Sequence, residues 1–186
     1  EKLKNIYDFL LGILILQLYN MSMKNTHKKI FLIIGTRPEA IKMIPLYKEL
    51  KKHFYVTLLS TGQHKETIIP IFKFFNVKPD IDLNLLQNSK NLEEISSNGI
   101  LELSQVFKQH KPDFVLVQGD TITAFIGAFV SMLNKIPIGH VEAGLRTGDI
   151  TSPFPEEASR QLISRIATMQ FCPTKNSVQN LIKENI

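Results

Sequence analysis

Residues 28–42 read KKIFLIIGTRPEAIK, an unbroken apolar run followed by a glycine and a sequence typical of a helix start. The run over Lys29 to Ile34 predicts a strand covered on both faces, because a strand with one solvated face would alternate polar and apolar residues. Beyond the glycine, Thr36 and Glu39 have the spacing of a capping box, and Pro38 suits a first helical turn. The stretch therefore predicts one strand–turn–helix unit of a parallel sheet.

The rest of the chain repeats this unit, since short apolar runs alternate with segments of helical spacing. We predict strands at Lys29 to Ile34, Tyr55 to Ser60, Phe114 to Gln118, Ile136 to Val141 and Thr168 to Cys172. We predict helices at Glu39 to Lys52, Lys65 to Phe75, Asn91 to Lys111, Thr121 to Leu133, Pro155 to Ala167 and Thr174 to Asn185. The helix over 121–133 is apolar on nearly every side, so we expect it to be buried, with Gly127 in close packing. The fold class is α/β, a Rossmann-like parallel sheet with helices on both faces.

Composition fits one compact domain, because 186 residues with 44% hydrophobic content can bury a sizeable core. The net charge is +5, but five lysines and two acidic residues up to residue 29 contribute 5 − 2 = +3 of it. No run of basic residues interleaved with aromatic ones follows, which argues against a nucleic-acid partner. Cys172 is the single cysteine, so an intrachain disulfide is excluded and a reducing, cytoplasmic compartment is expected.

Residues 1–28 precede the first predicted strand and contain an apolar block from Phe9 to Tyr19. A membrane-spanning helix needs about 20 apolar residues, and this block is shorter. The residues after it, Asn20 to Met23, lack the small-x-small pattern of a signal-peptide cleavage site. We interpret residues 1–28 as an N-terminal extension outside the fold and expect no membrane contact from it.

Charged residues follow the first predicted strand at the edge where parallel sheets bind ligands. Arg37 and Lys42 lie beside a helix start whose free backbone N–H groups we expect to hold an anion such as a phosphate. The alternative is that both are solvated helix residues. The turn is not a dinucleotide fingerprint, since the second and third glycines of that pattern are missing.

The next two strands also end in polar residues. Gln63 and His64 follow the second strand, and a histidine in such a loop is more often a cap or a surface residue than a catalyst. Asp120 follows the third strand, where it suits the N-cap of the next helix. A cap residue at this edge also faces the binding crevice, so both roles stay open.

Glu142 directly follows the fourth predicted strand, two residues after the polar His140, in the sequence GHVEAGLR over residues 139–146. No helix starts there for Glu142 to cap, so a structural role explains it poorly. We expect it to share a face with residue 140 and expect Gly144 to leave room for a ligand. His140 itself is expected to be a hydrogen-bonded core residue.

Further along, Glu156 and Glu157 open a predicted helix, where their charges would favour the helix dipole. Arg160 is spaced for an i to i+4 pair with Glu156. If Asp120, Glu142 and Glu156 converge on one crevice, they supply the carboxylates that acid–base chemistry requires.

Five motifs resemble the non-hydrolysing UDP-N-acetylglucosamine 2-epimerase family. They are GTRPEAIKM over residues 35–43, Thr61-x-Gln63-His64, Gly119-Asp120-Thr121, GHVEAGLRT over residues 139–147 and SPFPEEASR over residues 152–160. They run in the family's order and spacing from about Ile30 to the C-terminus. Hydrolysing relatives carry a His-Gly-Gly-Glu type turn where this chain has His140-Val141-Glu142, which argues for the non-hydrolysing branch.

The resemblance implies interconversion of UDP-N-acetylglucosamine and UDP-N-acetylmannosamine for bacterial surface polysaccharides, with neither a metal nor a nicotinamide cofactor. In that family UDP leaves in an anti elimination that removes the proton at carbon 2, and readdition of UDP to 2-acetamidoglucal inverts the configuration. Carried over to this chain, the essential carboxylates are Asp120, Glu142 and Glu156, and the substrate contacts are Arg37, Lys42, Asp120, Glu142 and Arg160. A second, activating UDP-N-acetylglucosamine would bind at Gln63 and His64, although Glu66 replaces a second glutamine of that site.

The family fold resembles the glycosyltransferase-B type, with two Rossmann-like domains and the active site between them. Residues 29–186 correspond to the first domain. We therefore expect the second domain to be absent from this chain, the chain to be inactive alone, and the full-length protein to be a homodimer that binds a nucleotide sugar. Two other hypotheses stay open: a non-catalytic half-domain that binds a partner, and a sugar-nucleotide glycosyltransferase of the same fold.

Overall fold

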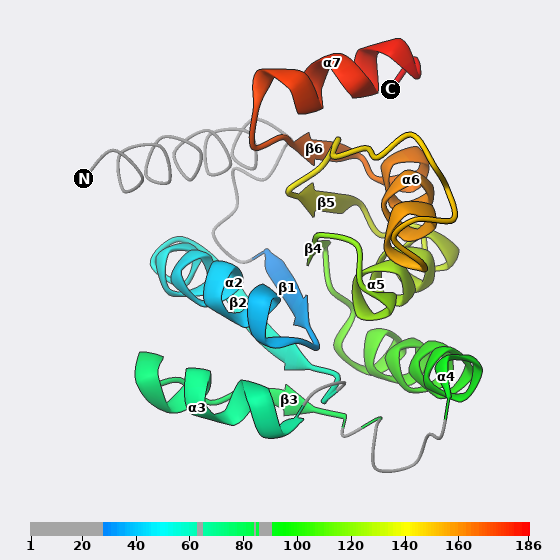
Figure 1. Ribbon diagram of the computed structural model, residues 1–186. Helices are drawn as coiled ribbons and strands as arrows, with labels where there is room; N and C mark the ends of the chain where they lie inside the picture. Colours follow the sequence, from blue (N-terminus) through cyan, green and yellow to red (C-terminus); the bar gives the residue numbers. More distant parts are fainter. Residues whose placement is uncertain (1–27, 63–64, 84, 86–90) are drawn as a thin grey trace.

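The computed structural model describes residues 28–62, 65–83, 85 and 91–186, and their arrangement is a parallel α/β sheet (Figure 1). The strands are β1 Lys29–Ile34, β2 Tyr55–Ser60, β3 Ile81–Asp82, β4 Phe114–Gln118, β5 Ile138–Val141 and β6 Met169–Phe171. The helices are α2 Arg37–Leu50, α3 Lys65–Phe75, α4 Leu92–His110, α5 Ile122–Leu133, α6 Glu156–Ile166 and α7 Lys175–Lys183. The strand order is β3-β2-β1-β4-β5-β6 and all neighbours are parallel, which confirms the predicted Rossmann-like class.

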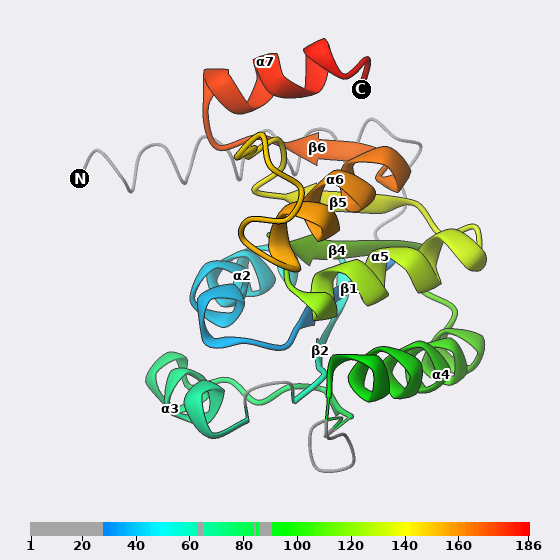
Figure 2. The same ribbon diagram turned by 45° about the vertical axis from the view of Figure 1, so that its right-hand side comes forward.

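Two hydrophobic cores lie on opposite faces of the sheet. Ile30 and Leu32 of β1 pack with buried residues of α2 and α3, whereas Phe31 and Ile33 pack with residues of α4, α5 and α6. Figure 2 shows α2 and α3 on one side of the sheet and α4, α5 and α6 on the other. This alternation along β1 explains the continuous apolar run, because both faces of the strand are covered.

The predicted α5 is buried over most of its length. A Cβ on Gly127 would lie 2.9 Å from Ile33 Cδ1 and 3.0 Å from Val117 Cγ1, so the expected close packing is confirmed. The last turn differs, since Met132 and Leu133 are 39% and 56% exposed. Burial thus ends before the helix does.

The remaining differences from the predicted elements are small. β3 was not predicted, because two residues carry no readable period. β5 begins two residues later than expected, after Pro137, which has no N–H to donate to a neighbouring strand. α2 begins at Arg37 rather than at Glu39, since Thr36 is its N-cap.

Of the predicted N-terminal extension, the structure describes Lys28 alone. Its ammonium lies 3.0 Å from Asp113 Oδ1, in the turn before β4. The rest of the extension, including the apolar block over residues 9–19, lies outside the described residues. Within residues 28–62, 65–83, 85 and 91–186, no helix has the length and apolar content needed to cross a membrane.

Candidate active site

The exits of β4 and β5 lie side by side and are joined by hydrogen bonds. Gly119 N–H donates to Val141 O at 2.9 Å, and the buried Gln118 amide donates to Glu142 Oε2. Glu142 follows the last residue of β5 with φ of +68°, so the turn and not the strand pleat sets its direction. A Cβ on Gly119 would lie 4.0 Å from Glu142 Oε2, so the carboxylate lies beside this glycine.

Lys42 of α2 forms an ion pair with Glu142 at the exit of β5. The two side chains are 46% and 27% exposed. A predicted substrate cation and a predicted catalytic carboxylate are therefore neighbours, on elements that are 100 residues apart in sequence.

The predicted N-cap role of Asp120 is wrong. α5 begins at Ile122, and its N-cap is Thr121, whose Oγ1 accepts from Ala124 N–H at 3.1 Å. Asp120 is one residue too early to cap this helix. Its carboxylate instead accepts a hydrogen bond from Arg160 Nη2 of α6.

The Asp120 carboxyl has a pKa raised above its ordinary value. Burial is the largest cause, and the negative charges of Glu156 and Glu142 raise the pKa further, while Arg160 opposes the rise. The charges of Glu142 and Glu156 therefore both act on Asp120, and the convergence of the three carboxylates stays a prediction. A raised pKa favours the protonated form of this carboxyl, as a proton-transfer group requires.

The predicted pair between Arg160 and Glu156 is wrong. Arg160 Nη1 lies 3.2 Å from Glu157 Oε2, and its other terminal nitrogen contacts Asp120. Glu157 is completely buried and also accepts from Thr147 N–H at 3.1 Å. Arg160 therefore lies between two carboxylates and connects α6 with the exit of β4.

Glu156 is the first residue of α6 and is partly exposed. Across the described part of the chain, its carboxylate has no hydrogen bond or ion pair, and its negative charge repels that of Asp120. The expected location in the first helical turn is confirmed.

Another carboxylate, that of Glu39, lies at the exit of β1. It is 1% exposed and accepts from Gly35 N–H at 2.8 Å, from Thr36 N–H at 2.6 Å and from Thr121 Oγ1 at 2.7 Å. Burial raises the pKa of Glu39 although these donors oppose the rise. The capping box is confirmed, and it joins the β1–α2 turn to the N-cap of α5.

The expected backbone anion site at the start of α2 is therefore largely filled by the chain itself. The N–H groups of Gly35 and Thr36 already donate to Glu39, so they are not free for a phosphate. Arg37 and Lys42 are exposed on the first two turns of α2. Anion binding at this exit would depend on their side chains.

The glycine turn after β5 packs against the C-terminal helix. A Cβ on Gly144 would lie 2.2 Å from Ser177 O of α7, so the room expected for a ligand is taken by α7. Arg146 forms a two-pronged ion pair with Glu184, with distances of 2.7 and 2.9 Å. The arginine of this motif thus holds α7 and does not face the carboxylates.

The predicted core role of His140 is confirmed. The ring is fully buried, and Nε2 lies 2.7 Å from Gly119 O. Burial lowers the pKa of His140 to about 4, so the ring is neutral at physiological pH. Gln63 and His64, predicted for an activator site, lie outside the described residues.

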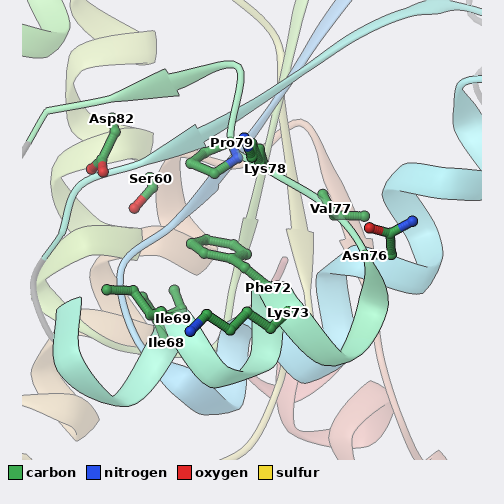
Figure 3. Close-up of a pocket in the computed structure, with 10 residues that line it drawn as sticks. All are labelled: Ser60, Ile68, Ile69, Phe72, Lys73, Asn76, Val77, Lys78, Pro79 and Asp82. Carbon is green, nitrogen blue, oxygen red and sulfur yellow. The ribbon is translucent and has the colours of Figure 1, made fainter.

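A cavity of about 570 Å³ lies elsewhere, between α3 and the edge of the sheet (Figure 3). Ile68 and Phe72 of α3 line it with Val77, and Ser60 and Asp82 lie at the ends of β2 and β3. β1 separates these strands from β4 and β5 in the sheet order. Its lining includes one carboxylate, so it does not assemble the groups that proton transfer needs. In the described ranges, no three His, Cys, Asp or Glu side chains are grouped as metal ligands.

Two residues that contact the candidate site were not predicted from the sequence. Gln118 is 3% exposed and orients Glu142, and Glu157 is buried between Arg160 and the loop at Thr147. A polar residue in the last position of a buried strand is a usable signal for Gln118. For Glu157 no signal separates it from Glu156, since both suit a first helical turn.

The chain matches known proteins along most of its described length. The family model "UDP-N-acetylglucosamine 2-epimerase" matches residues 48–186. The UDP-N-acetylglucosamine 2-epimerase of Bacillus subtilis (strain 168) is 48% identical over 161 residues, which is 84% of this chain and 42% of that protein.

Solved structures show the same relationship. The UDP-GlcNAc 2-epimerase from Neisseria meningitidis, bound to UDP-GlcNAc, has a TM-score of 0.82 at 44% identity, over 85% of this chain and 43% of that one. The enzyme from Methanocaldococcus jannaschii, in complex with UDP-GlcNAc and UDP, has a TM-score of 0.80 at 37% identity, over 85% and 44%. This chain spans less than half the length of these relatives. The chain belongs to the UDP-N-acetylglucosamine 2-epimerase family and corresponds to its N-terminal portion.

Proposed function

We propose that this chain is the N-terminal half of a non-hydrolysing UDP-N-acetylglucosamine 2-epimerase, which interconverts UDP-N-acetylglucosamine and UDP-N-acetylmannosamine. One observation carries the proposal: Asp120 and Glu142 lie at the exits of adjacent strands, and each contacts a cation, Arg160 or Lys42. Family membership and the relatives solved with UDP-GlcNAc support the choice of substrate.

The proposed chemistry needs two proton-transfer groups. One carboxylate takes the proton from carbon 2 while the bond between carbon 1 and the UDP oxygen breaks, and the electron pair of that bond leaves with UDP. The electrons of the broken C–H bond form the carbon 1–carbon 2 double bond of 2-acetamidoglucal. UDP then adds back to carbon 1, and a second group delivers a proton to the other ring face at carbon 2. Asp120, Glu142 and Glu156 are the candidates for these two groups.

We propose that the exposed cations of α2 bind the diphosphate. Arg37 is the first residue of α2, and Lys42 lies in its second turn, where it contacts Glu142. Positive charge at this place stabilises the leaving group, whose negative charge grows as the carbon–oxygen bond breaks. Arg160 would contact the substrate from α6, next to Asp120.

The relatives are more than twice as long as the part matched here. The complete activity is therefore proposed for a protein that also contains the second domain, which would form the other wall of the active site. That wall would carry the nucleotide pocket. We propose a cytoplasmic homodimer that requires neither a metal nor a nicotinamide cofactor and that serves surface polysaccharide synthesis. An activator site at Gln63 and His64 is part of the same proposal.

A chimaera tests this function. Residues 28–186 would be joined to the part of the Bacillus subtilis relative that follows the matched region, and UDP-N-acetylmannosamine formation would be measured. We expect turnover by the chimaera and none by this chain alone. Failure of a folded chimaera would favour a non-catalytic half-domain, and turnover by the chain alone would show that no second wall is needed.

A further inference from the structure

The side chain of His140 contacts the backbone at the exit of the neighbouring strand. Its ring is fully buried in β5, and Nε2 lies 2.7 Å from the carbonyl oxygen of Gly119. A carbonyl oxygen accepts and cannot donate, so the ring donates through Nε2–H. The tautomer is therefore fixed, with Nδ1 unprotonated in the neutral ring.

The Gly119 carbonyl belongs to the peptide group that leads directly into Asp120. Gly119 has φ of +71°, a conformation that glycine adopts freely and that the residue itself does little to hold. The preceding peptide is held by the bond from Gly119 N–H to Val141 O at 2.9 Å. With the bond from His140, the peptides on both sides of Gly119 are fixed from β5.

His140 is not placed to exchange a proton with a substrate. Its ring has no exposed surface, and one nitrogen is committed to Gly119 O. The other nitrogen, Nδ1, is buried without a hydrogen-bond partner. Any effect of His140 on the reaction must therefore pass through the groups that it contacts.

We propose that His140 is a positioning residue, which fixes the Gly119–Asp120 peptide and so sets the Asp120 carboxylate relative to Glu142. Glu142 lies two residues after His140 on the same strand exit, so one element places both carboxylates. The inference rests on the proposed role of these carboxylates in proton transfer. A displacement of about 1 Å at such a group can lower a rate about 100-fold.

The test compares two substitutions at this position in the chimaera described above. His140→Phe keeps an aromatic ring but removes the donor, whereas His140→Gln places an amide N–H near the position of Nε2. We expect His140→Phe to lower kcat by about 10- to 100-fold with KM changed less than about threefold, and to shift the limb of the pH–kcat profile that reports Asp120. We expect His140→Gln to restore most of kcat and the original profile.

A stability control separates positioning from general damage. Leu103→Ala removes a fully buried side chain of α4, away from the carboxylates, and should lower stability without moving the pH profile. If His140→Gln were as inactive as His140→Phe, or if Leu103→Ala reproduced the shifted profile, the proposal would be overturned. Full activity of His140→Phe in an active chimaera would overturn it while leaving the proposed function intact.

A second measurement does not depend on turnover. In this chain alone, hydrogen exchange of the Gly119 amide reports how firmly the turn is held. We expect His140→Phe to accelerate this exchange by about tenfold or more relative to the amides of β1, and His140→Gln to leave it close to that of the parent. In Leu103→Ala any acceleration should be shared by the amides of β1. Equal exchange in all three variants would contradict the positioning role even if the chimaera were inactive.

Discussion

The polar groups at the exit of β1 are arranged differently from those at the exits of β4 and β5. At the exits of β4 and β5, Asp120 and Glu142 are partly buried and held by Arg160, Lys42 and Gln118. At the exit of β1 the buried carboxylate of Glu39 caps the helix, and the cations stand outside on exposed turns of α2. We refer to these as the carboxylate side and the cation side.

The difference follows from what each side would do in the proposed reaction. A proton-transfer group must lie within hydrogen-bond distance of one atom, so its backbone and its partners must be fixed. A cation that attracts a diphosphate acts over a longer distance and can adjust its side chain as the ligand arrives. Rigid placement is therefore expected on the carboxylate side and mobility of side chains on the cation side.

The largest effect is expected when a fixed carboxylate is removed. Asp120→Asn in the chimaera keeps the shape of the side chain but cannot transfer the proton, so kcat should fall by about 10²–10⁴-fold. Asp149→Asn, in the exposed loop after β5, is the matched control and should leave kcat close to that of the parent. Steady-state assays of both variants check this, and activity of Asp120→Asn within a few-fold of the parent would remove Asp120 from the proposed mechanism.

A pH dependence of stability comes from the histidine on the carboxylate side. Burial, with smaller effects from the charges of Arg146 and Arg160, lowers the pKa of His140 from 6.5 to about 4, against the hydrogen bond to Gly119. The unfolded chain therefore binds this proton near pH 6.5, and the folded chain binds it only near pH 4. The contribution of the neutral His140 ring to the free energy of unfolding is complete above pH 6.5. It falls as the pH drops, by about 3 kcal/mol at pH 4.

Urea unfolding of this chain and of His140→Gln, each at pH 7 and pH 4.5, measures that contribution. Other titrating groups are shared, so the difference between the two proteins isolates the histidine. The parent should lose more stability than the variant on acidification. An equal loss in both would mean that the ring is not held neutral.

The backbone at Gly35, directly after β1, is tightly packed against Thr123 and Thr61. A Cβ there would lie 2.2 Å from Thr123 Oγ1 and 2.5 Å from Thr61 Oγ1, and these hydroxyls share a buried hydrogen bond of 2.9 Å. Gly35→Ala should therefore cost about 1–3 kcal/mol of unfolding free energy. Gly148→Ala is the control, since its Cβ would meet nothing within 4 Å and its cost is the strain of φ +86°, about 1 kcal/mol. A smaller cost at Gly35 than at Gly148 would contradict the packing.

The smallest effect is expected on the cation side. Arg37→Ala should raise KM by about tenfold and change kcat less, because a charged hydrogen bond contributes roughly 1.5–3 kcal/mol and water partly replaces it. The difference in KM between the parent and Arg37→Ala should shrink as salt is added, because the charge of an exposed side chain is screened. Lys52→Ala, just after the far end of α2, is the control. A fall in kcat as large as that of Asp120→Asn would erase the distinction between the two sides.

Most of the fold could be predicted because the local sequence pattern determines most of its helices and strands. β1, β2, β4 and α3 have the predicted bounds, since each is a run closed by a glycine or a polar residue. The two-residue β3 could not be predicted, because its pairing to β2 depends on tertiary contact and not on its own pattern.

The candidate site was predictable in its residues but not in their pairings. Strand ends marked Asp120 and Glu142, yet Arg160 pairs with Asp120 across 40 residues and not with its helical neighbour Glu156. It was also not predictable that Glu39 accepts from the backbone N–H groups of both Gly35 and Thr36. The capping-box spacing does not show how many backbone donors the glutamate uses. Such contacts depend on how distant turns meet at the edge of the sheet.

Epimerisation in D2O tests the central claim, that carboxylates at the exits of β4 and β5 exchange the proton at carbon 2. The chimaera would be incubated with UDP-N-acetylglucosamine, and the first UDP-N-acetylmannosamine formed would be examined by mass spectrometry and NMR. Transfer between two different groups on opposite ring faces predicts one deuterium at carbon 2 in nearly every product molecule. Product that keeps the original hydrogen at carbon 2 would contradict the account.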